Sequence, residues 1–217
     1  MRKKLDGILF DLDGTLWDSS RQVAVSWNET LKRYPKVHRE LDERDIRGIM
    51  GLQVPEIAGK LFPDLDRSES VELVTKCCRE ECAHLVRTGG VLFEGLKETL
   101  EHLSKEYPLF IISNCLEGYI ESFLEYHKTA SYFQDFLAAG ATGKGKAYNI
   151  KKMMEQYTLQ RCIYVGDTAG DQQAAKEAGI PFVYAVYGFG TVHAPCHKLE
   201  KFSDLPDLIK RIEEIMK

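Results

Sequence analysis

The feature that most constrains the fold is a regular alternation of strand-like and helix-like segments from about residue 95 onward. Short apolar runs are separated by longer segments with helical periodicity. Such alternation is typical of parallel strands joined by crossover helices, because tight turns cannot connect parallel strands. The sequence therefore predicts a Rossmann-like α/β fold, with a parallel sheet covered by helices on both faces. The expected strands are 7–10, 108–112, 136–139, 162–165 and 182–186, and the expected helices are 95–105, 116–127, 147–157, 171–178 and 204–216.

The stretch between the first strand and the rest of this pattern contains no strand-like run. It has the pattern of several helices, the first ended by Pro35, and a Thr-Gly-Gly linker follows at 88–90. We expect residues 17–90 to form an inserted helical cap beside the carboxyl edge of the sheet, and residues 1–16 and 91–217 to form the α/β core. The expected cap helices are 23–34, 43–49, 54–62 and 69–86.

Charge and cysteine content exclude several classes of function. The 217 residues carry a net charge of -4, with a pI near 5.9, which gives no electrostatic reason to expect a nucleic acid or a membrane as partner. The six cysteines show no paired spacing, so free thiols in a reducing cytoplasm are expected. No run approaches the length of a membrane helix, and nothing suggests a coiled coil or a repeat. We expect a cytoplasmic monomer.

Two carboxylates follow the first predicted strand. Asp11 and Asp13 come directly after an apolar run, and Gly14 breaks the pattern behind them. Acids two residues apart on a strand point the same way. Two such anions repel one another unless a cation or a shared proton relieves them. Taken alone, the pair indicates either a metal or acid/base site or a plain Asp/Gly turn.

Polar groups also follow three other predicted strands. Because the carboxyl ends of parallel strands meet at one edge of a sheet, all four sets are expected in one pocket. The acids could bind a hard cation such as Mg²⁺, and the lysine, hydroxyl and amide groups could hold phosphate oxygens. The three further sets are Ser113 with Asn114, a glycine-rich loop carrying Lys144 and Lys146, and Asp167 with Asp171.

The order of these motifs is DLDGT, an apolar strand ending in Ser-Asn, a lysine, and GDTAGD, and it is similar to the haloacid dehalogenase (HAD) superfamily of phosphohydrolases. The resemblance extends from Ile8 to about Leu208, and the helical stretch resembles the cap of phosphoglycolate-phosphatase-like and β-phosphoglucomutase-like members. It implies a Mg²⁺-dependent phosphatase that hydrolyses a small phosphorylated metabolite through an aspartyl-phosphate. The carboxylate at Asp13 favours an oxygen ester, because the haloacid and phosphonate branches lack it.

The resemblance also implies a role for each residue. Asp11 is the nucleophile, and Asp13 is the general acid and base. Mg²⁺ is held by the side chains of Asp11 and Asp167 and by the backbone carbonyl of Asp13. Lys146 neutralises charge on Asp11 and the phosphate, and Ser113 donates a hydrogen bond to the phosphoryl group.

Further roles are implied around this centre. Asp171 would hold a metal-bound water or a lysine, and Asn114 would stand beside the phosphoryl group. Gly14 and Thr15 would turn the chain so that their backbone N–H groups meet the phosphate. The predicted cap loop that faces the site contributes two candidate specificity residues, Arg47 and Gln53.

Several alternatives remain open at this stage. Lys144 could replace Lys146, although Lys146 directly opens the next predicted helix. Trp17 could pack on the substrate or shield the cap hinge. A sugar phosphomutase would use the same aspartyl-phosphate, and a non-catalytic phosphate- or partner-binding module could share the same fold.

Overall fold

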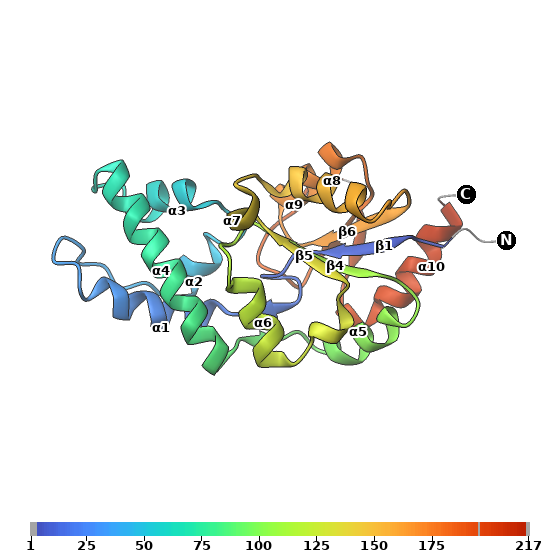
Figure 1. The fold of residues 1–217 in the computed structure, drawn as a ribbon, viewed down its shortest axis with the longest axis horizontal. Coiled ribbons are helices and arrows are strands. Elements are labelled where there is room, and N and C mark those ends of the chain that lie inside the picture. Colours follow the sequence, from blue (N-terminus) through green and yellow to red (C-terminus); the bar gives the residue numbers. More distant parts are fainter. Residues whose placement is uncertain (1–3, 195, 216–217) are drawn as a thin grey trace.

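The computed structural model describes residues 4–194 and 196–215, and its core is a six-stranded parallel sheet (Figure 1). The strand order is β5-β4-β1-β6-β7-β8, so β1 lies inside the sheet between β4 and β6. The predicted α/β fold with a parallel sheet is confirmed. The strands of this sheet are β1 (Gly7–Phe10), β4 (Leu109–Ser113), β5 (Asp135–Ala138), β6 (Cys162–Gly166), β7 (Phe182–Ala185) and β8 (His197–Leu199).

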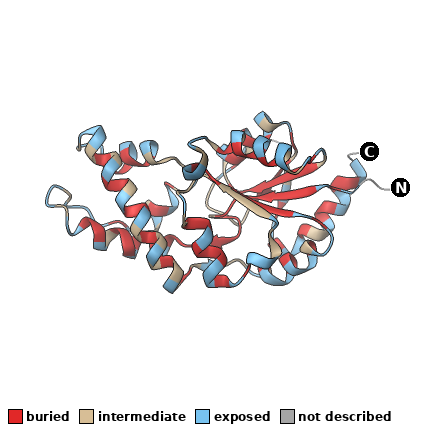
Figure 2. Ribbon diagram, viewed as in Figure 1, coloured by how far each residue is buried: buried red, intermediate tan, exposed pale blue. Residues whose placement is uncertain are grey.

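Helices cover both faces of the sheet, so its central strands are buried on both sides (Figures 1 and 2). Leu9 belongs to an apolar cluster with α8 and α9, whereas its neighbours Ile8 and Phe10 belong to a cluster with α5 and α10. This explains why β1 is continuously apolar rather than alternating. The four helices are α5 (Leu96–Ser104), α8 (Lys146–Gln156), α9 (Ala169–Ala178) and α10 (Leu205–Ile215).

Four further helices, which we call the helical segment (residues 20–88), pack on one another beside the carboxyl ends of the strands (Figure 1). The longest of them, α4, also packs against α6 (Tyr119–His127). This arrangement places one side of the segment opposite the strand ends. The four helices are α1 (Ser20–Leu31), α2 (Glu43–Arg47), α3 (Val54–Leu61) and α4 (Arg67–Thr88).

Capping side chains, a proline and a glycine mark where several of these helices begin and end. The Asp42 carboxylate accepts hydrogen bonds from two backbone N–H groups at the start of α2, and Pro55 stands in the first turn of α3. Gly89, at a φ of 64°, ends α4. The chain enters and leaves the segment through a two-residue antiparallel ladder of β2 (Trp17–Asp18) and β3 (Val91–Leu92).

The structure adds elements that the sequence did not predict. β8 is a three-residue edge strand, β2 and β3 have two residues each, and α7 (Ala139–Thr142) is a single turn, so none is long enough to show periodicity. The 3₁₀ turns η1 (Ala130–Tyr132) and η2 (Phe202–Asp204) were also not predicted.

The remaining differences concern boundaries. The predicted helix 116–127 begins only at Tyr119, after Gly118 at a φ of 92°. The predicted end of the last helix at Met216 lies outside the described residues. The exact division of the chain at residues 17–90 stays a prediction. Among the described residues, no helix has the length and apolar character needed to cross a membrane.

Candidate active site

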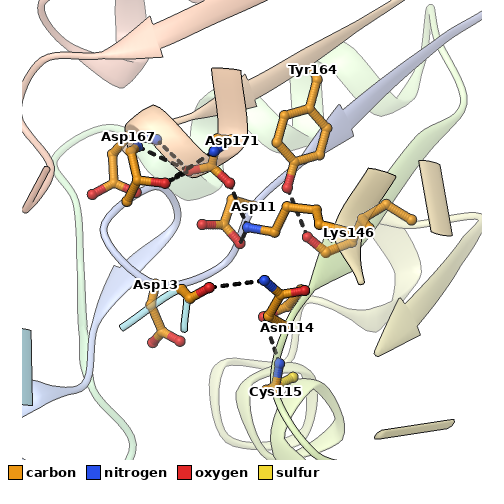
Figure 3. A network of polar contacts seen from close by, with 12 residues as sticks. Asp11, Asp13, Asn114, Cys115, Lys146, Tyr164, Asp167 and Asp171 are labelled. Carbon is orange, nitrogen blue, oxygen red and sulfur yellow. Dashed lines mark hydrogen bonds and ion pairs between the residues drawn. The ribbon is translucent and has the colours of Figure 1, made fainter. Parts of the chain in front are cut away.

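The ends of three neighbouring strands bring polar side chains together at one edge of the sheet (Figure 3). Asp11 follows β1, Ser113 is the last residue of β4, and Asp167 follows β6. Lys146, at the start of α8, extends to the same place. All four residues are buried. The topology therefore gathers four of the predicted site residues at the carboxyl edge of the sheet.

Lys146 is the cation at the centre of this group (Figure 3). Its Nζ atom lies 2.8 Å from an oxygen of Asp11 and 2.5 Å from an oxygen of Asp171, and its side chain is only 5% exposed. Burial by itself lowers the pKa of Lys146, but the charges of Asp11 and Asp171 raise it well above its usual value. Lys146 is therefore charged at neutral pH. Lys144, the alternative lysine, is exposed.

Three carboxylates crowd around this single lysine. Oxygens of Asp11, Asp167 and Asp171 lie within 4.8 Å of one another. Burial and the charge of Asp171 raise the pKa of Asp11 well above its usual value, although Lys146 opposes them. Burial and Asp171 also raise the pKa of Asp167 to about 7. The site thus concentrates more negative charge than one ammonium group can neutralise.

The cluster fits a hard divalent cation. Asp167 Oδ2 accepts hydrogen bonds from the backbone N–H groups of Phe189 (2.7 Å) and Gly190 (3.2 Å), whereas Asp167 Oδ1 is buried and has no hydrogen-bond partner in the described structure. An orphaned buried oxygen of this kind is expected to have a ligand. Carboxylate oxygens are the ligands that Mg²⁺ prefers, so the donor set suits that ion.

Both carboxylate oxygens of Asp171 have partners, whereas within the described residues only one oxygen of Asp167 does. One of its oxygens contacts Lys146, while Oδ2 accepts hydrogen bonds from the backbone N–H groups of Asp167 (3.2 Å) and Thr168 (2.9 Å) and from the Thr168 hydroxyl (2.7 Å). In return the Thr168 hydroxyl caps the start of α9. Asp171 is therefore placed to fix the lysine and the turn after β6.

The carboxylate of Asp13 takes no part in the three-carboxylate cluster, because its side chain is held by other groups. Asp13 Oδ1 accepts hydrogen bonds from Trp17 Nε1 (2.9 Å), the Tyr119 hydroxyl (2.8 Å) and the Ser19 hydroxyl (3.1 Å). Burial raises the pKa of Asp13 to about 6 even though these three donors oppose the shift. A carboxyl group that titrates near neutral pH can both give and take a proton.

Trp17 and Tyr119 thus position Asp13. The Trp17 ring is buried and also packs against Phe123 and His127, so it lies among aromatic rings rather than in an open pocket. Sequence reasoning missed Tyr119 altogether. It stands at the start of α6, after the strand that ends in Ser113, and no spacing rule connects it with Asp13.

The turn after Asp13 does not present the N–H groups that were expected to meet a phosphate. The N–H of Gly14 donates to the carbonyl of Trp17 (3.0 Å), and the N–H of Thr15 donates to the carbonyl of Leu12 (3.3 Å). These bonds close the turn on itself. The side chain of Thr15 differs from its backbone in this respect, because the hydroxyl oxygen is buried without a hydrogen-bond partner in the described part of the chain.

Two glycines let three loops meet around Asp167. A Cβ atom on Gly14, whose φ is 75°, would lie 2.3 Å from Asp167 Oδ2. A Cβ atom on Gly188 would lie 2.2 Å from the Cβ of Asp167 and 2.4 Å from the carbonyl oxygen of Gly14. The loop after β7, residues 188–190, is therefore part of the site, which the sequence analysis did not predict. Its Gly-Phe-Gly spacing was the available signal.

The two predicted cap residues lie at the boundary with the core. The guanidinium of Arg47 is 2.5 Å from an oxygen of Asp18 and lies over the ring of Phe189, 5.4 Å from its centre. The side-chain nitrogen of Gln53 lies 3.0 Å from where a Cβ on Gly145 would stand. Neither side chain lines the cavity described next, and their role in selecting a substrate stays a prediction.

A cavity of about 60 Å³ lies between the helical segment and the strand ends. Asn114 spans the same boundary, because its side-chain N–H donates to the carbonyl of Gly51 at 2.8 Å (Figure 3). Most of the wall consists of aliphatic side chains, two cysteines and Gly51. The polar side chains in the wall are those of Asp13, Trp27, Glu81, Ser113, Asn114 and Tyr119.

Glu81, on α4, is the second acid in this wall. It is buried, and Trp27 Nε1 donates a hydrogen bond to its carboxylate. Burial raises its pKa to about 8, so the group is largely protonated at pH 7. Sequence reasoning missed Glu81, because an acid in the middle of a charged helix looks like any solvated one.

The close approach at Gly188 can be tested by stability. Gly188→Ala is expected to lower the free energy of unfolding by about 1–3 kcal/mol, because the new methyl group would displace Asp167 or Gly14. Gly59→Ala is the matched control: Gly59 lies in α3 with no atom near its Cβ position, so it should be neutral or stabilise by up to about 1 kcal/mol. Urea denaturation measures both, and equal values would contradict the tight contact.

The buried state of Glu81 predicts a pH effect. The folded pKa of about 8 lies above the usual 4.5, so between these values the folded chain keeps a proton that the unfolded chain has lost. Stability is therefore lost as the pH rises through this window. Relative to Glu81→Gln, the wild type should lose unfolding free energy from about pH 5 to pH 8.

The neighbouring residue provides a control for this effect. Hydrogen bonds from Thr30 and then from Arg33 lower the pKa of the more exposed Glu80. The wild type should therefore gain stability relative to Glu80→Gln as the pH rises through the acid range. Denaturation curves recorded at several pH values measure both differences, and a Glu81 difference that stays flat from pH 5 to pH 8 would contradict the burial argument.

Comparisons with known proteins agree with this geometry. The family model described as haloacid dehalogenase-like hydrolase matches residues 8–185. A phosphoglycolate phosphatase of Aquifex aeolicus is 29% identical and covers 93% of this chain and 95% of its own length. A protein of the same name from Vibrio parahaemolyticus is 30% identical, with 84% of each chain covered.

Solved structures agree as well. A haloacid dehalogenase-like hydrolase of Streptococcus pneumoniae superposes with a TM-score of 0.80 at 25% identity, covering 94% of this chain and 97% of the other. CbbY of Rhodobacter sphaeroides, solved with phosphate, has a TM-score of 0.74 at 17% identity over 93% and 96% of the two chains, which shows a shared fold. The strand-end carboxylates, the lysine and the match over residues 8–185 lead to one conclusion: the chain belongs to the haloacid dehalogenase-like hydrolase family.

Proposed function

We propose that this chain, a phosphatase of that family, hydrolyses a small phosphate monoester with Mg²⁺ through an aspartyl-phosphate on Asp11. The observation that carries the proposal is the buried contact of Asp11 with Lys146 inside a cluster of three carboxylates. The names of the curated relatives, phosphoglycolate phosphatases, support a small phosphorylated substrate.

In the first step an oxygen of Asp11 attacks phosphorus, and the bond from phosphorus to the leaving oxygen breaks. Lys146 contacts Asp11 at 2.8 Å and would balance charge on both the carboxylate and the phosphoryl group. Ser113, buried at the end of β4, would donate its hydroxyl hydrogen to a phosphoryl oxygen. The leaving oxygen takes its proton from Asp13.

In the second step Asp13, now ionised, takes a proton from water, and the resulting hydroxide attacks phosphorus to free Asp11. The three donors on Asp13, from Trp17, Ser19 and Tyr119, hold it in one orientation for both transfers. Its pKa of about 6 suits a group that must be an acid and then a base near neutral pH.

Asp11, Asp167 and the backbone carbonyl of Asp13 are the groups that would hold Mg²⁺. The bound ion would supply positive charge against the repulsion between the carboxylates and the phosphate. Asp171 would act on the same centre by fixing Lys146. The helical segment would serve as a cap that keeps bulk water away from the phosphoryl group.

The nucleophile assignment predicts a loss of turnover. Asp11→Asn should lower phosphate release from p-nitrophenyl phosphate by at least about 1,000-fold, because the amide cannot form the aspartyl-phosphate. Asp207→Asn, at an exposed site on α10, is the matched control and should retain wild-type activity. If Asp11→Asn kept full activity, Asp11 would not be the nucleophile.

The metal assignment has a readout that does not depend on turnover. Mg²⁺ should raise the melting temperature of the wild type, because it relieves the repulsion between buried carboxylates. Asp167→Asn should lose most of this increase, and Asp207→Asn should keep it. Thermal unfolding with Mg²⁺ and with EDTA measures the difference, and an equal increase in all three proteins would exclude Asp167 as a ligand.

A further inference from the structure

The cavity between the helical segment and the strand ends is the place where the leaving group of a substrate would lie. This step rests on the proposed function. Asp13, which would protonate the leaving oxygen, and Ser113, which would hold the phosphoryl group, both line the cavity. A phosphate held at Asp11 would therefore have its ester oxygen next to this space, and the cavity wall would select what the oxygen carries.

The cavity wall has an unusual charge pattern for an enzyme that acts on anions. It contains two acids, Asp13 and Glu81, and no lysine, arginine or histidine among its described residues. Lys146 is not in this wall and is already shared by Asp11 and Asp171. Arg47 is paired with Asp18 outside it. A second anionic group on the substrate would therefore meet Asp13, the mostly protonated Glu81 and apolar side chains, with no counter-charge.

The hydrogen-bonding pattern of the wall also disfavours an anionic leaving group. Trp27 donates to Glu81, Tyr119 donates to Asp13, and the Asn114 amide donates to the carbonyl of Gly51. In contrast, the Asn114 side-chain oxygen is buried and has no partner within the described residues. The wall thus offers an unused acceptor, which a carboxylate cannot satisfy and a hydroxyl group can.

We propose that the leaving group of the natural substrate is a small, uncharged and largely apolar alcohol that carries neither a carboxylate nor a second phosphate. The aliphatic wall from α2, α3 and the loop between them would pack on its carbon atoms. A hydroxyl on the alcohol would donate to Asn114. Phosphoglycolate, whose name the relatives carry, has a carboxylate at this position and is therefore expected to be a poor substrate of this chain.

Two pairs of isosteric substrates test the proposal on the wild-type protein with saturating Mg²⁺. Isobutyl phosphate matches 2-phosphoglycolate in shape but lacks its negative charge. Propyl phosphate matches phosphoethanolamine but lacks its positive charge. Phosphate release should give a kcat/KM for isobutyl phosphate at least about tenfold above that for 2-phosphoglycolate, and propyl phosphate should not fall below phosphoethanolamine.

The possible outcomes are distinguishable. Equal or better turnover of 2-phosphoglycolate would overturn this inference and leave the proposed phosphatase intact. A clear preference for phosphoethanolamine would overturn it too, since the two acids would then be selecting a cation. Failure to hydrolyse any phosphate ester, p-nitrophenyl phosphate included, would overturn the proposed function and this inference together.

A variant of the cavity wall gives a second measurement. Leu52 is half-buried in the wall, and Leu52→Lys would place a cation there. It should reduce the ratio of kcat/KM for isobutyl phosphate over 2-phosphoglycolate several-fold, whereas the near-isosteric Leu52→Met should keep the wild-type ratio. A folded Leu52→Lys with an unchanged ratio would overturn the electrostatic explanation. If Leu52→Lys failed to fold, the wild-type ratio would still decide.

Discussion

The site depends on one buried ion pair network, in which Lys146 contacts both Asp11 and Asp171. Without it, three carboxylates would repel one another inside a protein that offers them little solvent. The network also links distant parts of the chain, because Asp11 follows β1, Lys146 begins α8 and Asp171 lies in the first turn of α9. The site is therefore complete only when β1, α8 and α9 are packed together.

The division of labour that we propose for the two carboxylates of the first motif is consistent with their surroundings. Asp11 faces a lysine and two other acids, an environment that suits a nucleophile that works next to a cation. Asp13, two residues later, is turned toward neutral donors on Trp17, Ser19 and Tyr119. The same residue type would thus serve two purposes, because one environment is ionic and the other is not.

The parts of this site that were predictable share a simple property. Asp11, Ser113, Lys146 and Asp167 all stand where an apolar strand or a glycine-rich loop ends, and the rule that parallel strands end at one edge is enough to bring them together. Tyr119 and Glu81 could not be found in that way, because they lie on α6 and α4 and reach the site only through the packing of these two helices, which local periodicity does not encode. The loop at 188–190 does follow a strand of the sheet, and its Gly-Phe-Gly spacing was the signal that went unused. Very short elements such as β2, β3 and α7 were missed for a related reason, since two to four residues carry no pattern.

The small ladder of β2 and β3 has a broader consequence. It brings the entry and the exit of the helical segment to the same point, where Gly90 passes so close that an added Cβ would lie 2.8 Å from the carbonyl oxygen of Asp18. The chain therefore enters and leaves the helical segment at one point of the core, and the other contacts of the segment with the core, such as α4 with α6 and Gly51 with Asn114, come from packing rather than from chain connections. Such an attachment would let the walls proposed to select a substrate diverge during evolution, while the strand ends proposed to carry out phosphoryl transfer stay as they are.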